Sequence, residues 1–313
     1  MSLSIKEAAA RIRAGGVVAF PTETVYGLGA NALDPSAVRR IYELKARPAT
    51  SPLIVHVSSA EMARGVVAEW PPLAEDLARR WWPGPLTMVL PKSAAIPEIV
   101  TAGLSTVGVR MPAHPVAREL IEEAGVPIAA PSANRFTGLS PTTAAHVRAA
   151  FGDSIGVLDG GPSQVGIEST VVAIESGNLK LLRPGMIAFE ESAFEELAAK
   201  SPEPGSAHPA PGMYRRHYSP RTPVLLVRDP KELPKGAGAY VWRQNPAAAS
   251  PAAASNVARR IQMPAGAASY AARLYAVLHE LDAENLPWIA VELPPETPEW
   301  TAIRDRLMRA AGR

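Results

Sequence analysis

Short apolar runs alternate with amphipathic stretches along residues 17–174, and this alternation narrows the possible folds more than any other feature. The runs are rich in valine and isoleucine, and the stretches between them place apolar side chains at helical spacing. The pattern predicts a mixed α/β domain. The predicted strands are 17–20, 53–57, 86–90, 106–110, 127–131 and 169–174, and the predicted helices include 35–47, 72–82 and 115–125.

The composition changes after residue 200. A helix-like stretch at 188–200 gives way to a segment dominated by proline and glycine. We therefore predict a first domain over 1–200, a proline-rich linker over 201–222 and a small α/β domain with a parallel, Rossmann-like sheet over 223–313. Its predicted strands are 223–227, 238–242 and 287–293, and its predicted helices are 269–281 and 298–311. It has no G-x-G-x-x-G turn, so this shape does not by itself imply a dinucleotide.

Composition excludes several classes of chemistry. The 313 residues contain no cysteine, which rules out disulfides, thiolate nucleophiles and cysteine-bound zinc. The formal net charge is only +2, so any anion site must be local rather than a general polyanion-binding surface. No run has the 18 or more apolar residues of a spanning helix, and the first residues lack the apolar block of a signal peptide. A cytoplasmic location is the expectation.

Lys45 and Arg47 raise the question of which anion they face. On a helix they would point to different sides, but Pro48 and Pro52 disfavour a helix here, and in an extended segment they would share one face. One interpretation is a solvated helix end, where cations favour the helix dipole. The other is an anion site, which needs support from other loops.

Four other segments offer that support. The loop 131–143 is rich in hydroxyl and amide groups that can bond phosphate or sugar oxygens, although Ser140 or Thr142 could instead cap a helix that begins near Thr143. Ser169 begins a predicted strand, and Arg183 ends one. Arg110 lies in an apolar strand, where its guanidinium needs either an anionic ligand or an internal salt bridge.

Familiar catalytic motifs are missing from the sequence. It has no G-x-x-x-x-G-K-[ST] loop, no G-x-S-x-G elbow and no H-E-x-x-H pair. A nucleotide would therefore need a different cradle, and a histidine-built metal site is not expected.

Six motifs together resemble the threonylcarbamoyl-AMP synthase family, which has the YrdC-like fold. The resemblance implies a twisted mixed sheet with a concave basic cavity, and the linker and small domain resemble the longer, two-domain branch of the family. The motifs, in order, are FPTETVYGLG (20–29), KARPATSPLIVH (45–56), TVGVRMP (106–112), APSAN (130–134), GIESTVV (166–172) and LRPG (182–185).

The resemblance also implies the roles of individual residues. The family's Lys-x-Arg and Ser-x-Asn signature falls on Lys45, Arg47, Ser132 and Asn134, which are the expected catalytic set. Threonine or its carbamate is expected at Thr24, His56, Arg110, Ala130 and Ser169, with Arg110 on the carboxylate. ATP is expected at Arg47, Ser51, Thr106, Ser132, Ser140, Arg183 and Tyr218, the last within HYSP of the linker.

The reaction that the resemblance implies is synthesis of L-threonylcarbamoyl-AMP from L-threonine, bicarbonate or carbon dioxide, and ATP, with release of pyrophosphate. Magnesium is an expected helper, with its ligands unassigned. The product would pass to a separate transferase that forms N6-threonylcarbamoyladenosine at position 37 of tRNA, so tRNA contact is not required here. Two positions depart from the family: Ser51 replaces a usual asparagine or lysine, and Ala173 a frequent aspartate.

Two other interpretations stay open. The chain could be a double-stranded RNA-binding module without catalysis, with basic clusters such as Arg215 and Arg216 on the phosphates. It could also be a related carbamoyl-transfer or maturation domain, although those proteins carry acylphosphatase and zinc-binding segments that a cysteine-free chain lacks. Aromatic and basic residues in the linker further suggest a lid that excludes water from the site.

Overall fold

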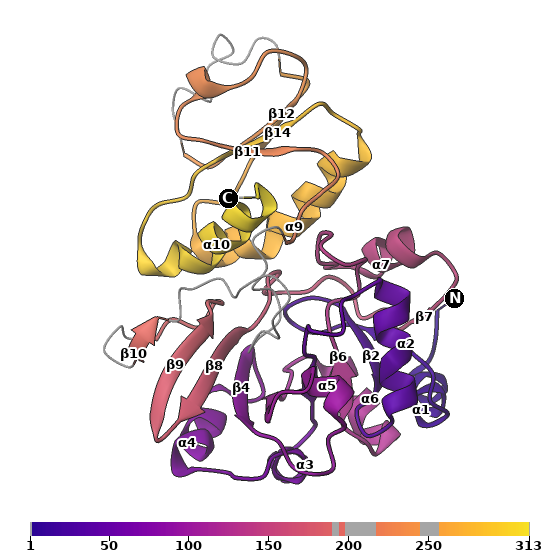
Figure 1. The fold of residues 1–313 in the computed structure, drawn as a ribbon. Coiled ribbons are helices and arrows are strands. Elements are labelled where there is room, and N and C mark those ends of the chain that lie inside the picture. Colours follow the sequence, from indigo (N-terminus) through magenta and orange to yellow (C-terminus); the bar gives the residue numbers. More distant parts are fainter. Residues whose placement is uncertain (1, 190–193, 198–216, 245–256, 313) are drawn as a thin grey trace.

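The computed structural model describes residues 2–189, 194–197, 217–244 and 257–312, and it contains two sheets. The larger sheet belongs to the first domain and the smaller one to the second, which packs on top of it in Figure 1. The predicted domain boundaries stay predictions, because most of the linker, residues 201–216, lies outside the described residues.

The elements of the first domain alternate much as the sequence indicates, and their bounds follow. The helices are α1 (Ile5–Arg13), α2 (Pro35–Lys45), α3 (Ala60–Val66), α4 (Pro72–Trp81), α5 (Glu98–Thr101), α6 (Pro115–Ala124) and α7 (Ala144–Phe151). The strands are β1 (Val18–Phe20), β2 (Gly27–Asn31), β3 (Ile54–His56), β4 (Leu86–Pro91), β5 (Thr106–Arg110), β6 (Ile128–Ala130), β7 (Gly156–Val157), β8 (Thr170–Glu175), β9 (Asn178–Arg183) and β10 (Phe194–Leu197).

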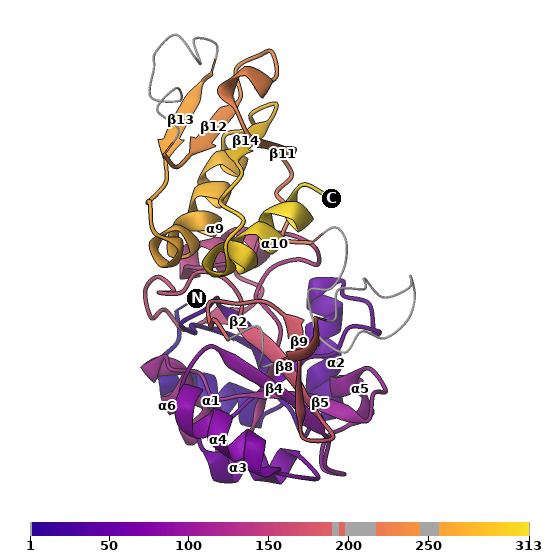
Figure 2. The ribbon, with the colours of Figure 1, turned by 90° about the vertical axis from the view of Figure 1, so that its left-hand side faces the viewer.

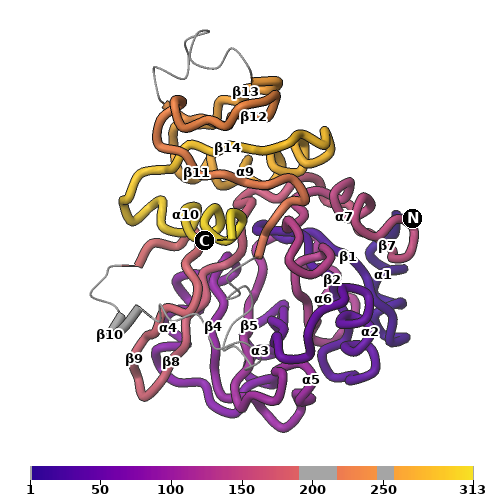
Figure 3. Tube along the Cα trace, turned by 45° about the horizontal axis from the view of Figure 1, so that its top comes forward, coloured from indigo at the N-terminus to yellow at the C-terminus, as the bar shows by residue number. Residues whose placement is uncertain are grey.

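The large sheet is mixed and has the order β10-β9-β8-β4-β5-β3-β6-β2-β1-β7. Parallel pairs such as β3 with β5 alternate with antiparallel pairs such as β4 with β5. Figure 3 shows β9, β8, β4 and β5 side by side. All six strands predicted for this domain are present, so the predicted mixed α/β class is confirmed.

Two expectations about the elements need correction. The stretch 188–200 was expected to be helical, but its described part contains β10, which pairs with β9 in parallel. Strand β2 has a glycine-rich sequence and was not predicted. Its glycines are needed because a Cβ on Gly29 would lie 2.6 Å from the Ile128 side chain and 2.7 Å from that of Phe20.

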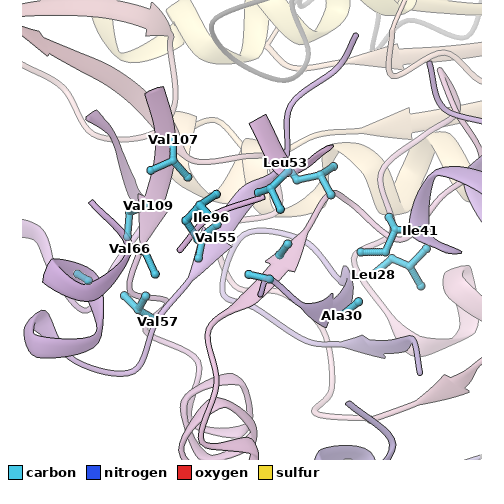
Figure 4. Close-up of a cluster of buried hydrophobic side chains, with 14 of the residues drawn as sticks. Leu28, Ala30, Ile41, Leu53, Val55, Val57, Val66, Ile96, Val107 and Val109 are labelled. Carbon is cyan, nitrogen blue, oxygen red and sulfur yellow. The ribbon is translucent and has the colours of Figure 1, made fainter. Parts of the chain in front are cut away.

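One face of the sheet packs against helices to form the main core. Alternate residues of β3 and β5, among them Val55, Val107 and Val109, point to this face. Helix α2 adds Ile41, and Figure 4 shows these side chains together. The other face carries the intervening residues of the same strands, including His56 and Arg110, so polar side chains gather there.

The second domain has a four-stranded parallel sheet of order β11-β14-β12-β13, which confirms the predicted parallel α/β domain. Its strands are β11 (Val224–Val227), β12 (Ala239–Trp242), β13 (Arg259–Gln262) and β14 (Ile289–Glu292), and its helices are α9 (Ala267–Ala283) and α10 (Thr301–Ala310). Strand β13 was not predicted. Figure 2 shows α9 and α10 between this sheet and the first domain.

Apolar side chains join the two domains. Val25, Leu139 and Ile167 of the first domain belong to the same buried cluster as Leu274 and Leu278 of α9. Because this shared cluster is buried, the two domains should unfold with some cooperativity. Within the described ranges, no helix is long and apolar enough to cross a membrane.

Gly166 tests the contact between the domains. It has φ +77°, and a Cβ there would lie 2.5 Å from the backbone of α9 at Ala271 and Ala272. Gly166→Ala is expected to lower the free energy of unfolding by about 2–5 kcal/mol, because backbone strain and overpacking add. Gly125→Ala is the matched control, since Gly125 has φ +68° but open space around it, and it should cost only about 1–2 kcal/mol. Equal losses in urea titrations would contradict close packing at Gly166.

Candidate active site

A small buried cavity lies at the polar face of the large sheet, next to the second domain. Its volume is about 50 Å³. Three arginines, two histidines and several hydroxyl groups converge on it from strands, loops and the end of the linker. Its lining includes Thr22, Thr24, Val25, Gly27, Arg47, Ile54, His56, Arg110, Ala130, Pro131, Ser132, Glu168, Ser169, Arg183, His217 and Tyr218.

The end of α2 places Lys45 and Arg47. Helix α2 ends at Lys45, and Ala46 follows in the left-handed conformation with φ 52°. The exposed fractions of Lys45 and Arg47 are 1% and 8%. These values contradict the interpretation of a solvated helix end. Arg47 donates hydrogen bonds to the carbonyl oxygens of Ser51 (3.3 Å) and Pro52 (3.1 Å), which hold its guanidinium at the cavity wall.

Lys45 supports the neighbouring loop. Its ammonium donates to the carbonyl oxygens of Ser132 (2.6 Å) and Asn134. Burial, together with the positive charges of Arg47 and Arg135, lowers the pKa of Lys45 well below its usual value. Lys45 therefore fixes the backbone of the Ser-x-Asn segment from behind.

Asn134 shapes the loop that follows. Its side-chain amide donates to the carbonyl oxygens of Arg135 (2.7 Å) and Gly138 (2.8 Å), which folds residues 134–138 into a tight turn. Further along, the residue that caps α7 is Thr143, whose hydroxyl accepts from the backbone of His146, so the alternative of a cap at Ser140 or Thr142 is wrong.

Arg110 makes an internal ion pair. Its Nη2 lies 2.7 Å from Oε1 of Glu23, and its Nη1 donates to the hydroxyl of Thr24 at 2.9 Å. Burial opposes the charge on Glu23, but Arg110 more than offsets that effect and lowers the pKa of Glu23. The internal salt bridge considered for Arg110 is therefore present, and Glu23 is a site residue that the sequence analysis missed. The only sign of Glu23 in the sequence was that it is an acid inside the motif PTET.

Ser169 and Arg183 form a second buried group. Arg183 donates from Nε and Nη2 to the carbonyl oxygen of Ser169, at 3.1 and 3.0 Å, and from Nη2 to its hydroxyl at 3.1 Å. The Ser169 hydroxyl also lies 2.8 Å from that of Thr87 on β4. These bonds fix the Ser169 side chain at the start of β8 with little freedom to rotate.

Glu168 also lines the cavity and was not predicted. Its carboxylate accepts from the hydroxyl of Ser140 (2.5 Å) and pairs with Arg306 of α10 (2.7 Å). The second domain therefore contacts a residue of the cavity wall directly. Because Glu168 pairs with Arg306 of the second domain, the spacing of residues within the first domain could not predict that Glu168 belongs to the site.

The described end of the linker closes one side of the cavity. Tyr218 is 1% exposed, has φ 58° and packs against His217, with ring centroids 4.1 Å apart. The hydroxyl of Tyr218 is buried and has no hydrogen-bond partner among the described residues. Burial raises the pKa of Tyr218, so its phenol stays protonated and keeps a proton to donate.

The sequence-predicted residues fall into three groups. Nine line the cavity: Thr24, Arg47, His56, Arg110, Ala130, Ser132, Ser169, Arg183 and Tyr218. Four lie outside that lining within the described residues and contact it through neighbours: Lys45, Ser51, Asn134 and Ser140. Thr106 lines a second cavity of about 390 Å³ instead.

The second cavity lies further along the same face of the sheet. Thr106 and Arg110 are four residues apart on β5, so both side chains point to one face. Val89, Ala173 and Leu182 also line this cavity, together with Glu69 and Glu175.

Comparisons with known proteins agree with this geometry. The Sua5–YciO–YrdC family model, described as telomere recombination, matches residues 10–185, and a model described as threonylcarbamoyl-AMP synthase, C-terminal domain, matches residues 178–312. The chain belongs to the threonylcarbamoyl-AMP synthase family. The match to the second model places it in the two-domain branch.

Individual relatives extend over most of the chain. The threonylcarbamoyl-AMP synthase of Bacillus subtilis is 40% identical over 98% of this chain and 93% of its own length. That of Pyrococcus abyssi is 50% identical over 73% of this chain and 69% of its own length. The crystal structure of P. abyssi Sua5 with L-threonine aligns with a TM-score of 0.88 at 39% identity, covering 98% of this chain and 94% of that one.

His56 offers a test of burial at the site of this synthase-family chain. Burial, reinforced by Arg110, lowers the pKa of His56 to about 3 from an ordinary 6.5, so folded His56 stays neutral while the unfolded chain gains a proton below pH 6.5. Stability should fall as the pH drops below that value. Between pH 7 and 5 the wild type is expected to lose about 2 kcal/mol more than His56→Asn in urea titrations. Identical losses would show that His56 is not buried as a neutral side chain.

Proposed function

We propose that this chain is a nucleotidyltransferase that makes L-threonylcarbamoyl-AMP from L-threonine, bicarbonate or carbon dioxide, and ATP, and releases pyrophosphate. The observation that carries the proposal is the convergence of Arg47, Arg110 and Arg183 on one buried cavity with hydroxyl groups between them. Guanidinium groups and hydroxyls are the donors that carboxylates and phosphates prefer. The P. abyssi relative, which was crystallised with L-threonine, supports the amino-acid part.

The proposed chemistry has two steps. The neutral amine of threonine attacks carbon dioxide, a C–N bond forms and a proton leaves, which gives a carbamate. A carbamate oxygen then attacks the α-phosphorus of ATP, the new O–P bond forms, and the bond from the α-phosphorus to the bridging oxygen breaks so that pyrophosphate departs. The carbamate is already an anionic nucleophile, so the second step needs positioning and charge stabilisation more than a strong base.

Threonine is proposed to bind at the centre of the sheet. Arg110 would take the carboxylate, since its guanidinium faces the cavity beside the hydroxyl of Thr24. His56 pairs with Arg110 in strand register and, as a neutral imidazole, can accept a hydrogen bond there. Ala130 and Ser169 border the same space. Glu23 keeps Arg110 aligned through the ion pair between them.

ATP is proposed to extend from the first cavity to the second. Arg47, Ser132 and Arg183 would face the phosphates, because all three line the first cavity. Thr106 would contact the nucleoside in the larger second cavity. Lys45, Ser51, Asn134 and Ser140 would act by holding this wall in place. Lys45 donates to the backbone of Ser132, and the carbonyl oxygen of Ser51 accepts from Arg47. Asn134 folds the turn that follows, and Ser140 donates to Glu168. These supporting roles differ from the expected ones, in which Lys45 and Asn134 were catalytic and Ser51 and Ser140 bound ATP.

The first cavity must open for these ligands. Its volume of about 50 Å³ is far below the roughly 300 Å³ or more that small-molecule sites usually have. His217 and Tyr218 of the linker fill one side of it, so their movement is the simplest way to admit ATP. A linker that returns over the bound substrates would shield the carbamate from water.

Magnesium remains a prediction without ligands. Among the described residues, no group of three or more histidine, aspartate or glutamate side chains could hold a metal ion. Glu168 is the carboxylate at the cavity wall, and its pairing with Arg306 makes it a poor ligand. The described residues therefore do not form a magnesium site of their own, and the steps above are derived without one.

The product would be used elsewhere. Threonylcarbamoyl-AMP is a mixed anhydride that a tRNA threonylcarbamoyl transferase would consume, in the cytoplasm. The alternative of a double-stranded RNA-binding module has no support in the comparisons, and an enclosed cavity suits a small ligand better than a duplex. The basic pair proposed for that role, at 215 and 216, lies outside the described residues.

The proposed reaction has a direct test. Purified protein with ATP should release pyrophosphate only when both L-threonine and bicarbonate are present, because the nucleophile is the carbamate of the two. Release is measured with a coupled pyrophosphate assay, and L-alanine replaces threonine as the control for amino-acid recognition. Release that does not depend on threonine would contradict the proposed function.

The lid is tested at Tyr218. Tyr218→Ala is expected to lower kcat/KM for ATP about tenfold or more, because a side of the cavity is lost and water can enter. Ser219→Ala is the matched control: the Ser219 hydroxyl donates to carbonyl oxygens of α10 and does not line the cavity within the described residues. Unchanged kinetics in Tyr218→Ala would show that the linker is not a lid.

A further inference from the structure

One arginine of the second domain reaches the wall of the active site. The Arg306 side chain on α10 is fully buried, with 0% of its surface exposed. Its Nε lies 2.7 Å from Oε2 of Glu168, and its Nη2 donates to the carbonyl oxygen of Pro184 at 3.0 Å. Its guanidinium carbon lies 5.2 Å from the ring centroid of Tyr218. Two residues of the cavity wall, Glu168 and Tyr218, and the residue after Arg183 therefore meet at this one side chain.

Glu168 is a charged residue in an unfavourable place. It lines the cavity, is 6% exposed and accepts hydrogen bonds from Ser140 (2.5 Å) and from Tyr275 of α9 (3.2 Å). Burial favours its neutral form, but Arg306 and Arg183 offset this and lower the pKa of Glu168. The cavity wall thus carries a negative charge where the proposed substrates are themselves anions.

The charge on Glu168 needs compensation from outside the first domain. A carboxylate a few ångströms from a triphosphate repels it strongly in a buried, poorly screened site. Arg183 also faces the cavity, and in the proposed function it binds phosphate. Arg306 is the cation placed on the far side of Glu168, toward the second domain, so it can neutralise the carboxylate without occupying the site.

We infer that Arg306 is a positioning residue of the second domain that cancels the charge of Glu168 and so keeps the active-site cavity selective for phosphate anions. The inference rests on the proposed function, because it assumes that a polyphosphate enters this cavity. Through Glu168, Arg306 also fixes Ser140, and through Pro184 it fixes the loop after Arg183. The second domain then contributes electrostatics to catalysis in addition to packing.

The test measures binding of inorganic pyrophosphate to the full chain by calorimetry. Arg306→Met leaves Arg183 as the remaining cation that compensates Glu168 and is expected to raise the dissociation constant about tenfold or more. Glu168→Gln removes the repelling charge and should tighten binding. The double variant Glu168→Gln/Arg306→Met should return to within a few-fold of the wild type, because the two residues act as a pair.

Arg304→Met is the matched control on the same helix. Arg304 pairs with Glu296 (2.6 Å) on the other side of α10 and should leave pyrophosphate binding unchanged. A purely structural Arg306 predicts the opposite pattern: Glu168→Gln would weaken binding, and the double variant would be no better than Arg306→Met. If Arg306→Met does not fold, Glu168→Gln and the double variant still decide between the two patterns.

The outcomes separate this inference from the proposed function. Failure of the wild type to release pyrophosphate from ATP with threonine and bicarbonate would reject the function, while the pyrophosphate titrations would still show whether Arg306 controls an anion site. Weaker binding in Glu168→Gln, or no pyrophosphate binding by any of the four proteins, would overturn the inference.

Discussion

The burial of charge is the constraint on which the active site depends. Lys45, Arg47, Arg110 and Arg183 are each less than a tenth exposed, and a buried cation without partners would be very costly. Backbone carbonyl oxygens offset much of this cost by accepting hydrogen bonds. Those of Ser132 and Asn134 accept from Lys45, and that of Ser169 accepts from Arg183. Because the carbonyls are neutral, they hold Arg47 and Arg183 in place without cancelling their charge, which keeps these two side chains suited to anions.

The same constraint explains how the domains fit together. Glu168 and Arg306 lie in different domains and form a buried ion pair, and the loss of either would leave the other with only Arg183 or Asp305 as an oppositely charged neighbour. The apolar cluster shared by Ile167 and Leu274 surrounds this pair with side chains that exclude water. Docking of the second domain therefore satisfies hydrophobic and electrostatic requirements at once. This makes separation of the domains more costly than their apolar contact alone would.

Sequence patterns predicted the strands and helices well, because hydrophobic periodicity reflects which face is buried. They failed where a different force decided the structure. Strand β2 carries glycines instead of β-branched residues, since neighbouring side chains leave no room for a Cβ. The stretch 188–200 has the composition of a helix, yet β10 pairs with β9, because tertiary pairing can override local propensity. Nine of the fourteen predicted site residues line the cavity, but Glu23 and Glu168 were missed because spacing does not show which acids are buried beside a cation.

Lys45 and Arg47 show why spacing alone was ambiguous. A residue pair two apart cannot share a helical face, and an extended segment would have placed both on one side. The chain does neither: the left-handed turn at Ala46 ends α2, and it sends Lys45 to the backbone of the Ser-x-Asn loop while Arg47 reaches the cavity. The two cations of one motif thus have separate tasks, one supporting the loop and the other facing the ligand. The motif is therefore better explained by the backbone that it holds than by an anion alone. Lys45 bonds to the carbonyl oxygen of Ser132 and so fixes a residue that lines the cavity together with Arg47.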